Sequence, residues 1–187
     1  MTTPFQVTMA RLTIPVGDDD HVRGPEQAPV TLVEYGDYQC PYCGMAYPIV
    51  NDLLRLRSES VRFVFRHFPL TNVHPYAELA AEVAEAAGSR DRFWPMHDWL
   101  FEHQRNINPR HLMVGVEQIG LPADVIARET SAHRYIDRIR RDFVGGVRSG
   151  VNGTPTFYVN GVRHDGGYTL DELLEAVDEA AESVEAR

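Results

Sequence analysis

Two cysteines separated by two residues, in the run Cys40-Pro41-Tyr42-Cys43, stand where a predicted strand passes into a predicted helix. The β-branched and apolar run Val30–Tyr35 predicts a buried strand, and apolar residues at helical spacing predict a helix over residues 40–57. Val61–Phe65 predicts a second strand, so this region forms a βαβ unit. A Cys-x-x-Cys sequence at such a junction is typical of a redox-active pair rather than of a scattered disulfide framework.

The positions of the two cysteines predict a different role for each. Unpaired backbone N–H groups and the helix dipole stabilise an anion at a helix start, so the Cys40 thiol should have a lowered pKa and act as the nucleophile. Cys43 lies one turn further on, close enough to attack a mixed disulfide formed at Cys40. Pro41 fits the first helical turn, where its missing N–H costs nothing.

Two other interpretations of the cysteine pair stay open at this point. A structural zinc site needs four ligands, and His67 and His74 are candidates, although their spacing from the pair does not match a zinc-finger pattern. The cysteines could also be buried and inert, but a proline between them and a position at a helix start both argue against inertness.

Helices follow the βαβ unit, and a hairpin with one more helix ends the chain. The predicted helices cover residues 77–87, 91–103, 109–119, 122–129 and 132–147, with Asn108 and Ser131 as expected caps. Residues 156–163 contain an Asn-Gly pair between two apolar runs, which predicts a hairpin with a type I′ turn. Thr169 and Glu172 form a capping box before the last, amphipathic helix.

The order of elements predicts an α/β fold of βαβ…ββα type with an inserted all-helical subdomain. We divide the chain into an N-terminal arm over residues 1–24, an α/β domain over 25–74 and 150–187, and a helical insertion over 75–149. One edge strand is expected in the arm near Val7–Leu12.

Pro155 directly precedes the first strand of the predicted hairpin, and a proline is hard to accommodate there outside an edge or a turn. Together with the cysteine motif, it suggests a cis Thr154–Pro155 bond that presents backbone toward the thiols. Backbone polar groups left free at this place could pair with an extended peptide. We therefore expect Thr154 and Pro155 to contribute to substrate binding.

Composition excludes several classes of function. The 187-residue chain has 43% apolar residues and a net charge of −9, which describes a globular domain without the basic surface of a nucleic-acid binder. All 18 basic residues are arginine, so Schiff-base and P-loop lysine chemistry are excluded. The start of the sequence shows no signal-peptide pattern and no apolar run is long enough to span a bilayer, so we expect a cytoplasmic protein.

The run Val33–Cys43 and the downstream run Gly153–Phe157 resemble the DsbA-like branch of the thioredoxin superfamily. The segment Phe65–Leu70 and the helix-kinking Pro48 share this resemblance, which extends over residues 25–181. The sequence is especially similar to the thioredoxin-like domains fused to bacterial sodium/proton antiporters. The resemblance implies a thioredoxin fold, disulfide exchange with protein or peptide thiols, recycling by a redox partner or a small thiol, and no metal or organic cofactor.

Within this resemblance, Cys40 is the attacking thiol, Cys43 the resolving thiol and Pro155 the cis proline. Pro41 and Tyr42, between the cysteines, would tune the redox properties of the pair. Many DsbA proteins carry histidine at the position of Tyr42. Without that cation we expect Cys40 to be less acidic and the disulfide less oxidising.

Glu34 lies six positions before Cys40, within the otherwise apolar first strand. Burial would raise the pKa of its carboxyl group and make it a proton shuttle for Cys43. The alternative is a surface-facing residue of an alternating strand. Arg66 and His67 follow the second strand and are candidates to approach the site, although a structural role for His67 is the simpler expectation.

The aromatic residues between positions 93 and 101 are expected in the core of the helical subdomain, with His97 and His103 on a partly exposed face of the same helix. The sequence as a whole predicts a dithiol–disulfide oxidoreductase. A redox-sensing or peptide-binding module without turnover is the alternative. A glutathione-transferase-like protein is disfavoured, because such proteins generally lack the second cysteine.

Overall fold

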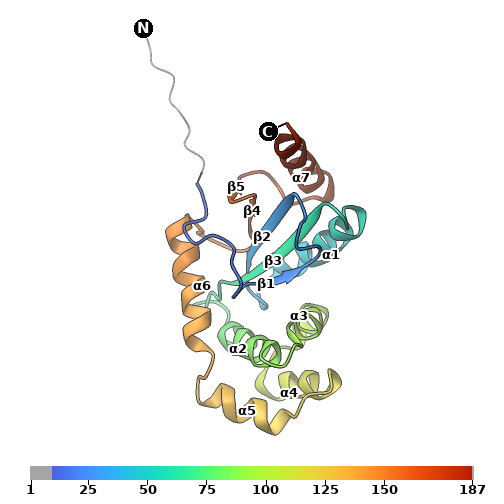
Figure 1. Ribbon diagram of the computed structural model, residues 1–187. Coiled ribbons are helices and arrows are strands. Elements are labelled where there is room, and N and C mark those ends of the chain that lie inside the picture. Colours follow the sequence, from blue (N-terminus) through green and yellow to red (C-terminus); the bar gives the residue numbers. More distant parts are fainter. Residues whose placement is uncertain (1–9, 187) are drawn as a thin grey trace.

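The computed structural model describes residues 10–186, which form a mixed five-stranded sheet surrounded by helices (Figure 1). The strand order is β1-β3-β2-β4-β5; β2 and β3 are parallel, and the other neighbours are antiparallel. The strands are β1 (His21–Arg23), β2 (Val30–Gly36), β3 (Val61–His67), β4 (Thr156–Val159) and β5 (Val162–His164).

The helices follow the same chain order that the sequence predicts. One short 3-10 turn, Gln104–Asn106, separates the third and fourth of them. The α-helices are α1 (Pro41–Leu56), α2 (Ala77–Gly88), α3 (Phe93–Glu102), α4 (Pro109–Gln118), α5 (Ala123–Ser131), α6 (Ile136–Ser149) and α7 (Leu170–Glu185).

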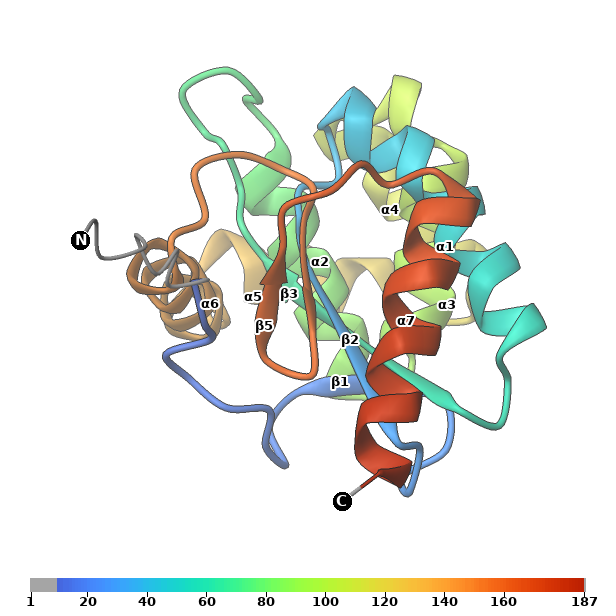
Figure 2. The ribbon, with the colours of Figure 1, turned by 90° about the horizontal axis from the view of Figure 1, so that it is seen from above.

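Helices cover both faces of the sheet, and successive side chains of each strand point alternately to the two faces. On β2, Leu32 belongs to the large core that includes residues of α1 and α7, whereas Val33 and Tyr35 face a smaller core that includes Phe143 of α6. Seen from above, α1 and α7 lie together on one side of the sheet and α6 on the other (Figure 2). The central strands are therefore buried on both faces, which explains their nearly continuous apolar sequence.

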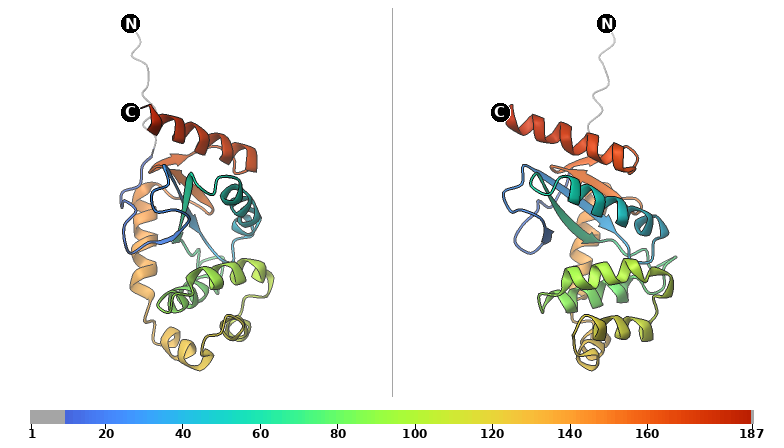
Figure 3. Two further views of the ribbon diagram at one scale, coloured as in Figure 1. Left: turned by 45° about the vertical axis from the view of Figure 1, so that its right-hand side comes forward. Right: turned by 90° about the vertical axis from the view of Figure 1, so that its right-hand side faces the viewer.

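The helices α2 to α5 extend the molecule beyond one end of the sheet (Figure 3). They do not form a separate core, because Leu112 of α4 and Ile126 of α5 belong to the same buried cluster as Leu32 of the central strand. The aromatic residues of α3 are part of this cluster, as expected. The helix that closes the segment, α6, returns along the second face of the sheet.

Several local signals are confirmed. The Asn108 side chain caps α4 by accepting the backbone N–H of His111 at 3.0 Å, and Thr169 and Glu172 form the capping box of α7. Asn160 and Gly161 both have positive φ angles, 46° and 78°, as a type I′ turn between β4 and β5 requires.

Other expectations need correction. Strand β1 was not predicted, because three half-buried residues on a sheet edge carry too little pattern. Ser131 does not cap a helix but ends α5, and α6 begins only at Ile136. His97 is buried rather than partly exposed, because α3 is packed on more than one side.

The expected edge strand at Val7–Leu12 lies mostly outside the described residues. In its described part, Arg11 forms an isolated antiparallel bridge with Val162 of β5. The N–H of Leu12 donates to the carbonyl of Gly161, and the N–H of Arg163 donates to that of Ala10. Within residues 10–186, no helix combines the length and the apolar character needed to cross a bilayer.

Candidate functional site

The two cysteines lie at the start of α1, where β2 and the following turn deliver them. Cys40 is the N-cap residue and Pro41 is the first residue of the helix, so the proline occupies the position at which it is tolerated best. Cys43, one turn later, is fully buried against the sheet. Both thiols are free, and Cys40 is only 3% exposed.

The loop before β4 lies against Cys40. The Cys40 Sγ is 3.2 Å from the carbonyl oxygen of Thr154, and the Thr154–Pro155 peptide bond is cis. The Thr154 hydroxyl oxygen is buried and, among the described residues, has no hydrogen-bond partner when the Cys40 thiol donates to the carbonyl. The structure thus brings together two separate motifs, Cys40–Cys43 and Thr154–Pro155, whose nearest residues are 111 positions apart in the sequence.

Hydrogen bonds lower the pKa of the Cys40 thiol to about 5. The largest contribution comes from the thiol of Cys43; the Thr154 side chain and the backbone N–H groups of Cys43 and Tyr42 add to it, against a burial effect that raises the pKa. Cys40 is therefore a thiolate at neutral pH without a cation in the Cys-x-x-Cys loop. Hydrogen-bond donors supply the stabilisation that a histidine at position 42 would provide.

Burial raises the pKa of the Cys43 thiol well above its ordinary value, and the charges of Cys40 and Glu34 raise it further. At neutral pH the pair therefore consists of one thiolate at the helix start and one buried thiol. Such a pair has distinct attacking and resolving members.

Glu34 is buried at 3% exposure in the central strand β2. It alternates with Val33 and Tyr35, which face the α6 side, so its side chain points to the side of the sheet that α1 and Cys43 cover. Burial raises the pKa of its carboxyl group to about 8, with a smaller contribution from the charge of Cys40. In the part of the chain that the structure describes, its Oε1 has no hydrogen-bond partner. The surface-facing alternative for this residue is wrong.

Asp37 holds the turn that leads into the cysteines. Its carboxylate accepts hydrogen bonds from the backbone N–H groups of Gln39 and Leu70 and contacts the His74 ring at 2.7 Å. Its own N–H points at the Cys43 Sγ, 3.5 Å away. The sequence analysis missed Asp37, although an aspartate directly after a buried strand and before a turn is a signal for such a role.

Gln104, from the 3-10 turn after α3, is a second residue that sequence reasoning missed. Its side-chain amide donates to the carbonyls of Tyr38 and Cys40, at 3.0 Å and 2.8 Å. These hydrogen bonds connect the helical segment between β3 and β4 to the Cys40 loop. No local pattern in the sequence predicts this contact.

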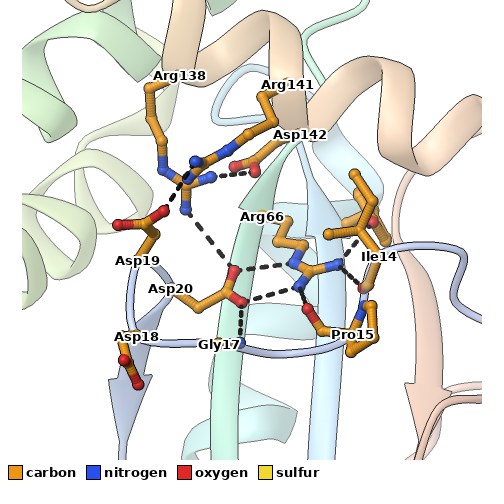
Figure 4. A pocket seen from close by; sticks show the side chains of 11 residues that line it. Ile14, Pro15, Gly17, Asp18, Asp19, Asp20, Arg66, Arg138, Arg141 and Asp142 are labelled. Atoms are coloured by element: carbon orange, nitrogen blue, oxygen red, sulfur yellow. Dashed lines mark hydrogen bonds and ion pairs between the residues drawn. The ribbon is translucent and has the colours of Figure 1, made fainter.

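The structure does not bring Arg66 and His67 to the cysteines. Adjacent residues of a strand face opposite sides, so Arg66 points to the α6 side, where it pairs with Asp20 and binds the carbonyls of Ile14 and Pro15 (Figure 4). The His67 ring contacts Glu85 at 2.8 Å. The two histidines considered as zinc ligands are thus engaged with Glu85 and Asp37.

The surface around the buried Cys40 combines exposed apolar side chains with a pocket lined mostly by polar residues. Tyr42 and Met45, on the first turns of α1, are 59% and 60% exposed. A pocket beside them is lined by Pro41, Gly44, Met45 and the segment 101–106. A chain that reaches Cys40 would therefore meet both exposed apolar side chains and the polar groups of the segment 102–106.

A family model described as thioredoxin matches residues 17–179, well over half of the chain. The chain belongs to the thioredoxin family. This confirms the resemblance inferred from the two motifs and the expected thioredoxin fold. The match includes the helices between β3 and β4, so they are part of the family's pattern in this chain.

Solved structures share the fold of this thioredoxin-family chain. BdbD from Bacillus subtilis, in its oxidised form, superposes with a TM-score of 0.83 at 24% identity, over 94% of this chain and all of that one. A thioredoxin-like oxidoreductase from Silicibacter pomeroyi DSS-3 superposes with a TM-score of 0.77 at 27% identity, over 89% and 94% of the two chains.

Among curated proteins, the chain is 50% identical over 170 residues to the Na(+)/H(+) antiporter NhaA 1 of Salinispora arenicola. The alignment covers 90% of this chain but 26% of that protein. The chain spans about a quarter of the length of the curated relatives it matches. The thioredoxin-family domain is therefore the part that they share.

Proposed function

We propose that the protein is a dithiol–disulfide oxidoreductase that exchanges disulfides with protein or peptide thiols through Cys40 and Cys43. The observation that carries this proposal is the asymmetry of the pair. Cys40 is a thiolate at a helix start beside the Thr154 carbonyl, and Cys43 is a buried thiol one turn behind it. The 27% identical structure from Silicibacter pomeroyi DSS-3, described as a thioredoxin-like oxidoreductase, supports the same class of reaction.

In the reductive direction, the Cys40 thiolate attacks a substrate disulfide, forms a mixed disulfide and releases one substrate sulfur as a thiolate. Cys43 then loses its proton and attacks the Cys40 sulfur. This forms the Cys40–Cys43 disulfide and releases the second substrate thiolate. Two electrons pass from the cysteine pair to the substrate, and the oxidative direction reverses each step.

Other residues of the site have supporting roles in this proposal. Glu34, buried on the Cys43 side of the sheet with a pKa of about 8, accepts the proton that Cys43 must lose when its own carboxyl group is ionised. The backbone at Thr154 and Pro155 pairs with an extended substrate segment, because its polar groups face the thiolate. Pro41 and Tyr42 shape the first turn, whose N–H groups stabilise Cys40.

The direction of electron flow depends on the reduction potential and the compartment. Known thioredoxin-fold couples span about −270 to −120 mV, and stabilisation of the reduced thiolate makes a pair more oxidising. A reducing compartment, such as the cytoplasm expected from the sequence, would keep the pair reduced, and the protein would then act as a reductase or isomerase. Equilibration with a defined thiol buffer measures this potential.

Turnover in insulin reduction and in refolding of scrambled ribonuclease tests the proposal. We expect Cys40→Ser to abolish turnover in both assays, because the serine hydroxyl does not attack a disulfide. Cys43→Ser is the matched variant: it keeps the nucleophile, so it should accumulate a mixed disulfide that is visible on a non-reducing gel. If Cys40→Ser keeps full turnover, the assignment of the attacking thiol is wrong.

A redox-sensing module without turnover is the second candidate. It is favoured by the fact that the chain matches a quarter-length part of curated relatives named as antiporters. A sensor would form the Cys40–Cys43 disulfide reversibly but would not turn over a protein substrate. Wild-type protein that oxidises and reduces normally, yet fails in both turnover assays, would support this candidate against the enzyme.

A further inference from the structure

Three potential metal ligands come together where α2 meets the connection between α5 and α6. One oxygen of Glu78, one oxygen of Glu82 and a ring nitrogen of His133 all lie within 4.8 Å of one another. Glu78 and Glu82 are one turn apart on α2 and so share a face of this helix. His133 comes from the connection between α5 and α6 and reaches across to them, with its Nδ1 2.7 Å from the Glu82 Oε1.

Glu82 makes this cluster different from an exposed group of acids. Its side chain is 1% exposed, and its Oε2 is buried without a hydrogen-bond partner among the residues that the structure describes. A buried carboxylate oxygen without a partner costs free energy, and native proteins seldom leave one unsatisfied. The Oε1 of the same carboxylate contacts His133, so the unsatisfied Oε2 lies next to the cluster, where a cation would satisfy it.

We propose that Glu78, Glu82 and His133 bind one divalent transition-metal cation of the Zn²⁺ type, with water completing its coordination. Two carboxylates and one imidazole are ligands that such cations accept, and the imidazole disfavours Mg²⁺ and Ca²⁺, which prefer oxygen. The two carboxylate charges match the charge of the ion. The inference is independent of the disulfide chemistry.

The cluster has an open route for the ion and one cation nearby. The His133 side chain is 66% exposed, so the ion can enter from solvent past the imidazole. Arg140 is the nearby cation; its guanidinium is 69% exposed and lies 3.8 Å from Asp137. Its exposure allows it to stay in water when the ion binds. The bound ion would tie α2 to the α5–α6 connection and stabilise the helical segment.

The test uses untagged protein that carries Cys40→Ser and Cys43→Ser, because free thiolates bind Zn²⁺ themselves. Thermal unfolding is followed in buffered Zn²⁺ and, separately, in Mg²⁺. We expect Zn²⁺ to raise the unfolding midpoint and Mg²⁺ to leave it unchanged. Wild-type protein with its cysteines oxidised to the disulfide replaces the double variant if that variant does not fold.

Variants locate the site. Glu78→Gln and His133→Asn should weaken Zn²⁺ binding by at least about tenfold, since each removes a direct ligand. Asparagine suits position 133 because it tolerates the left-handed φ of 49° found there. His111→Asn is the matched control: its ring is 5.8 Å from that of His103, a pair of neighbouring histidines outside the proposed site.

Co²⁺ provides a second readout, because its visible absorption changes when an imidazole enters or leaves the coordination shell. We expect His133→Asn to alter this spectrum and His111→Asn to preserve it. The proposal is overturned if Zn²⁺ does not raise the midpoint, if Mg²⁺ raises it equally, or if His111→Asn rather than His133→Asn removes the effect. Each variant's metal-free midpoint shows that it is folded.

Discussion

At the scale of single residues, the reactivity of the site depends on which groups surround each ionisable side chain. Cys40 and Cys43 differ by three positions, yet one has a lowered pKa and the other a raised one. The difference comes from hydrogen-bond donors at the helix start in one case and from complete burial in the other. Two side chains, Thr154 and Glu34, allow these contributions to be tested separately.

Thr154→Val should raise the pKa of the Cys40 thiol by roughly one unit, because valine keeps the shape of threonine but removes the hydroxyl donor. A hydrogen bond to a charged group contributes about 1.5–3 kcal/mol, so the expected rise lies at the lower end of what its loss can cause. The absorbance of the thiolate at 240 nm as a function of pH measures this change. Thr130→Val is the control, since the Thr130 hydroxyl bonds within α5 to the Ile126 carbonyl. An unchanged Cys40 pKa in Thr154→Val would show that the Thr154 hydroxyl does not stabilise the thiolate.

Glu34→Gln should slow the resolution of a mixed disulfide at Cys40 by roughly 100-fold at pH 9, where Glu34 is ionised in the wild type. Glutamine fills the same space but does not accept a proton. Release of a chromogenic thiol from a preformed mixed disulfide measures the rate, and the rise of the wild-type rate near pH 8 should disappear in the variant. Equal rates from pH 5 to 9 would contradict the shuttle.

The pH dependence of the free energy of unfolding tests the raised pKa of Glu34 independently of the reaction rate. Between about pH 4.5 and 8 the unfolded chain has an ionised Glu34 while the native chain keeps it protonated, so the free energy of unfolding falls as the pH rises through this window. Above pH 8 this contribution is constant. Relative to wild type, Glu34→Gln should therefore gain stability with rising pH, on the order of 5 kcal/mol across the window. Chemical denaturation at several pH values measures the gain.

At the scale of elements, the packing of α6 on the sheet depends on a glycine at the point of closest approach. A Cβ at Gly146 would meet the Phe68 ring at 2.8 Å and the Tyr35 ring at 3.0 Å. Phe68 also stacks on Phe143, one helical turn earlier, with 4.4 Å between ring centroids. The absence of a side chain at Gly146 thus allows α6 to lie close to the Phe68 and Tyr35 rings.

Gly146→Ala should destabilise the protein by about 1–3 kcal/mol, because the aromatic rings beneath α6 cannot move away without disturbing the smaller core. Alanine has a higher helix propensity than glycine, so a helix free of this contact would be stabilised instead. Val147→Ala, at an exposed position of the same helix, should change stability by less than about 0.5 kcal/mol. Urea denaturation distinguishes the two results; a more stable Gly146→Ala protein would contradict the close approach.

At the scale of the whole molecule, a network of charges with a buried pair at its centre connects the chain before β1 to the sheet and to α6 (Figure 4). Arg66 and Asp20 pair at 2.8 Å, with side chains 3% and 7% exposed. Arg138 lies 3.7 Å from the same aspartate, and Arg141 binds the neighbouring Asp19. The segment over residues 14–20 is therefore part of the folded body.

Asp20→Asn should destabilise the protein by about 3–5 kcal/mol, because it leaves the Arg66 guanidinium buried without its counter-charge. Asp124→Asn is the matched control, since its pair with Arg128 is about 70% exposed on both sides and should contribute less than about 1 kcal/mol. The free energy of unfolding measures both. Equal small effects would show that the network does not hold the segment.

The comparison of sequence and structure separates local from long-range information. Strands β2 to β5, the helices, the hairpin turn and the capping box could be predicted, because each depends on periodicity or on residues a few positions apart. The contact of Asp37 with His74 and that of Gln104 with the Cys40 loop could not, because nothing in a local pattern specifies a distant partner. His97 lies four positions from both Phe93 and Phe101, so its spacing indicated burial, whereas its polar character favoured exposure.

The two edges of the sheet are short, and this bears on what happens when the protein meets unfolded chains. Strands β1 and β5 have three residues each, and β5 is partly paired by the chain around Arg11. An extended foreign segment therefore finds few free N–H and C=O groups on which to build a further strand. Under the proposed function, unfolded polypeptide would reach the thiols without meeting a template for its aggregation at these edges.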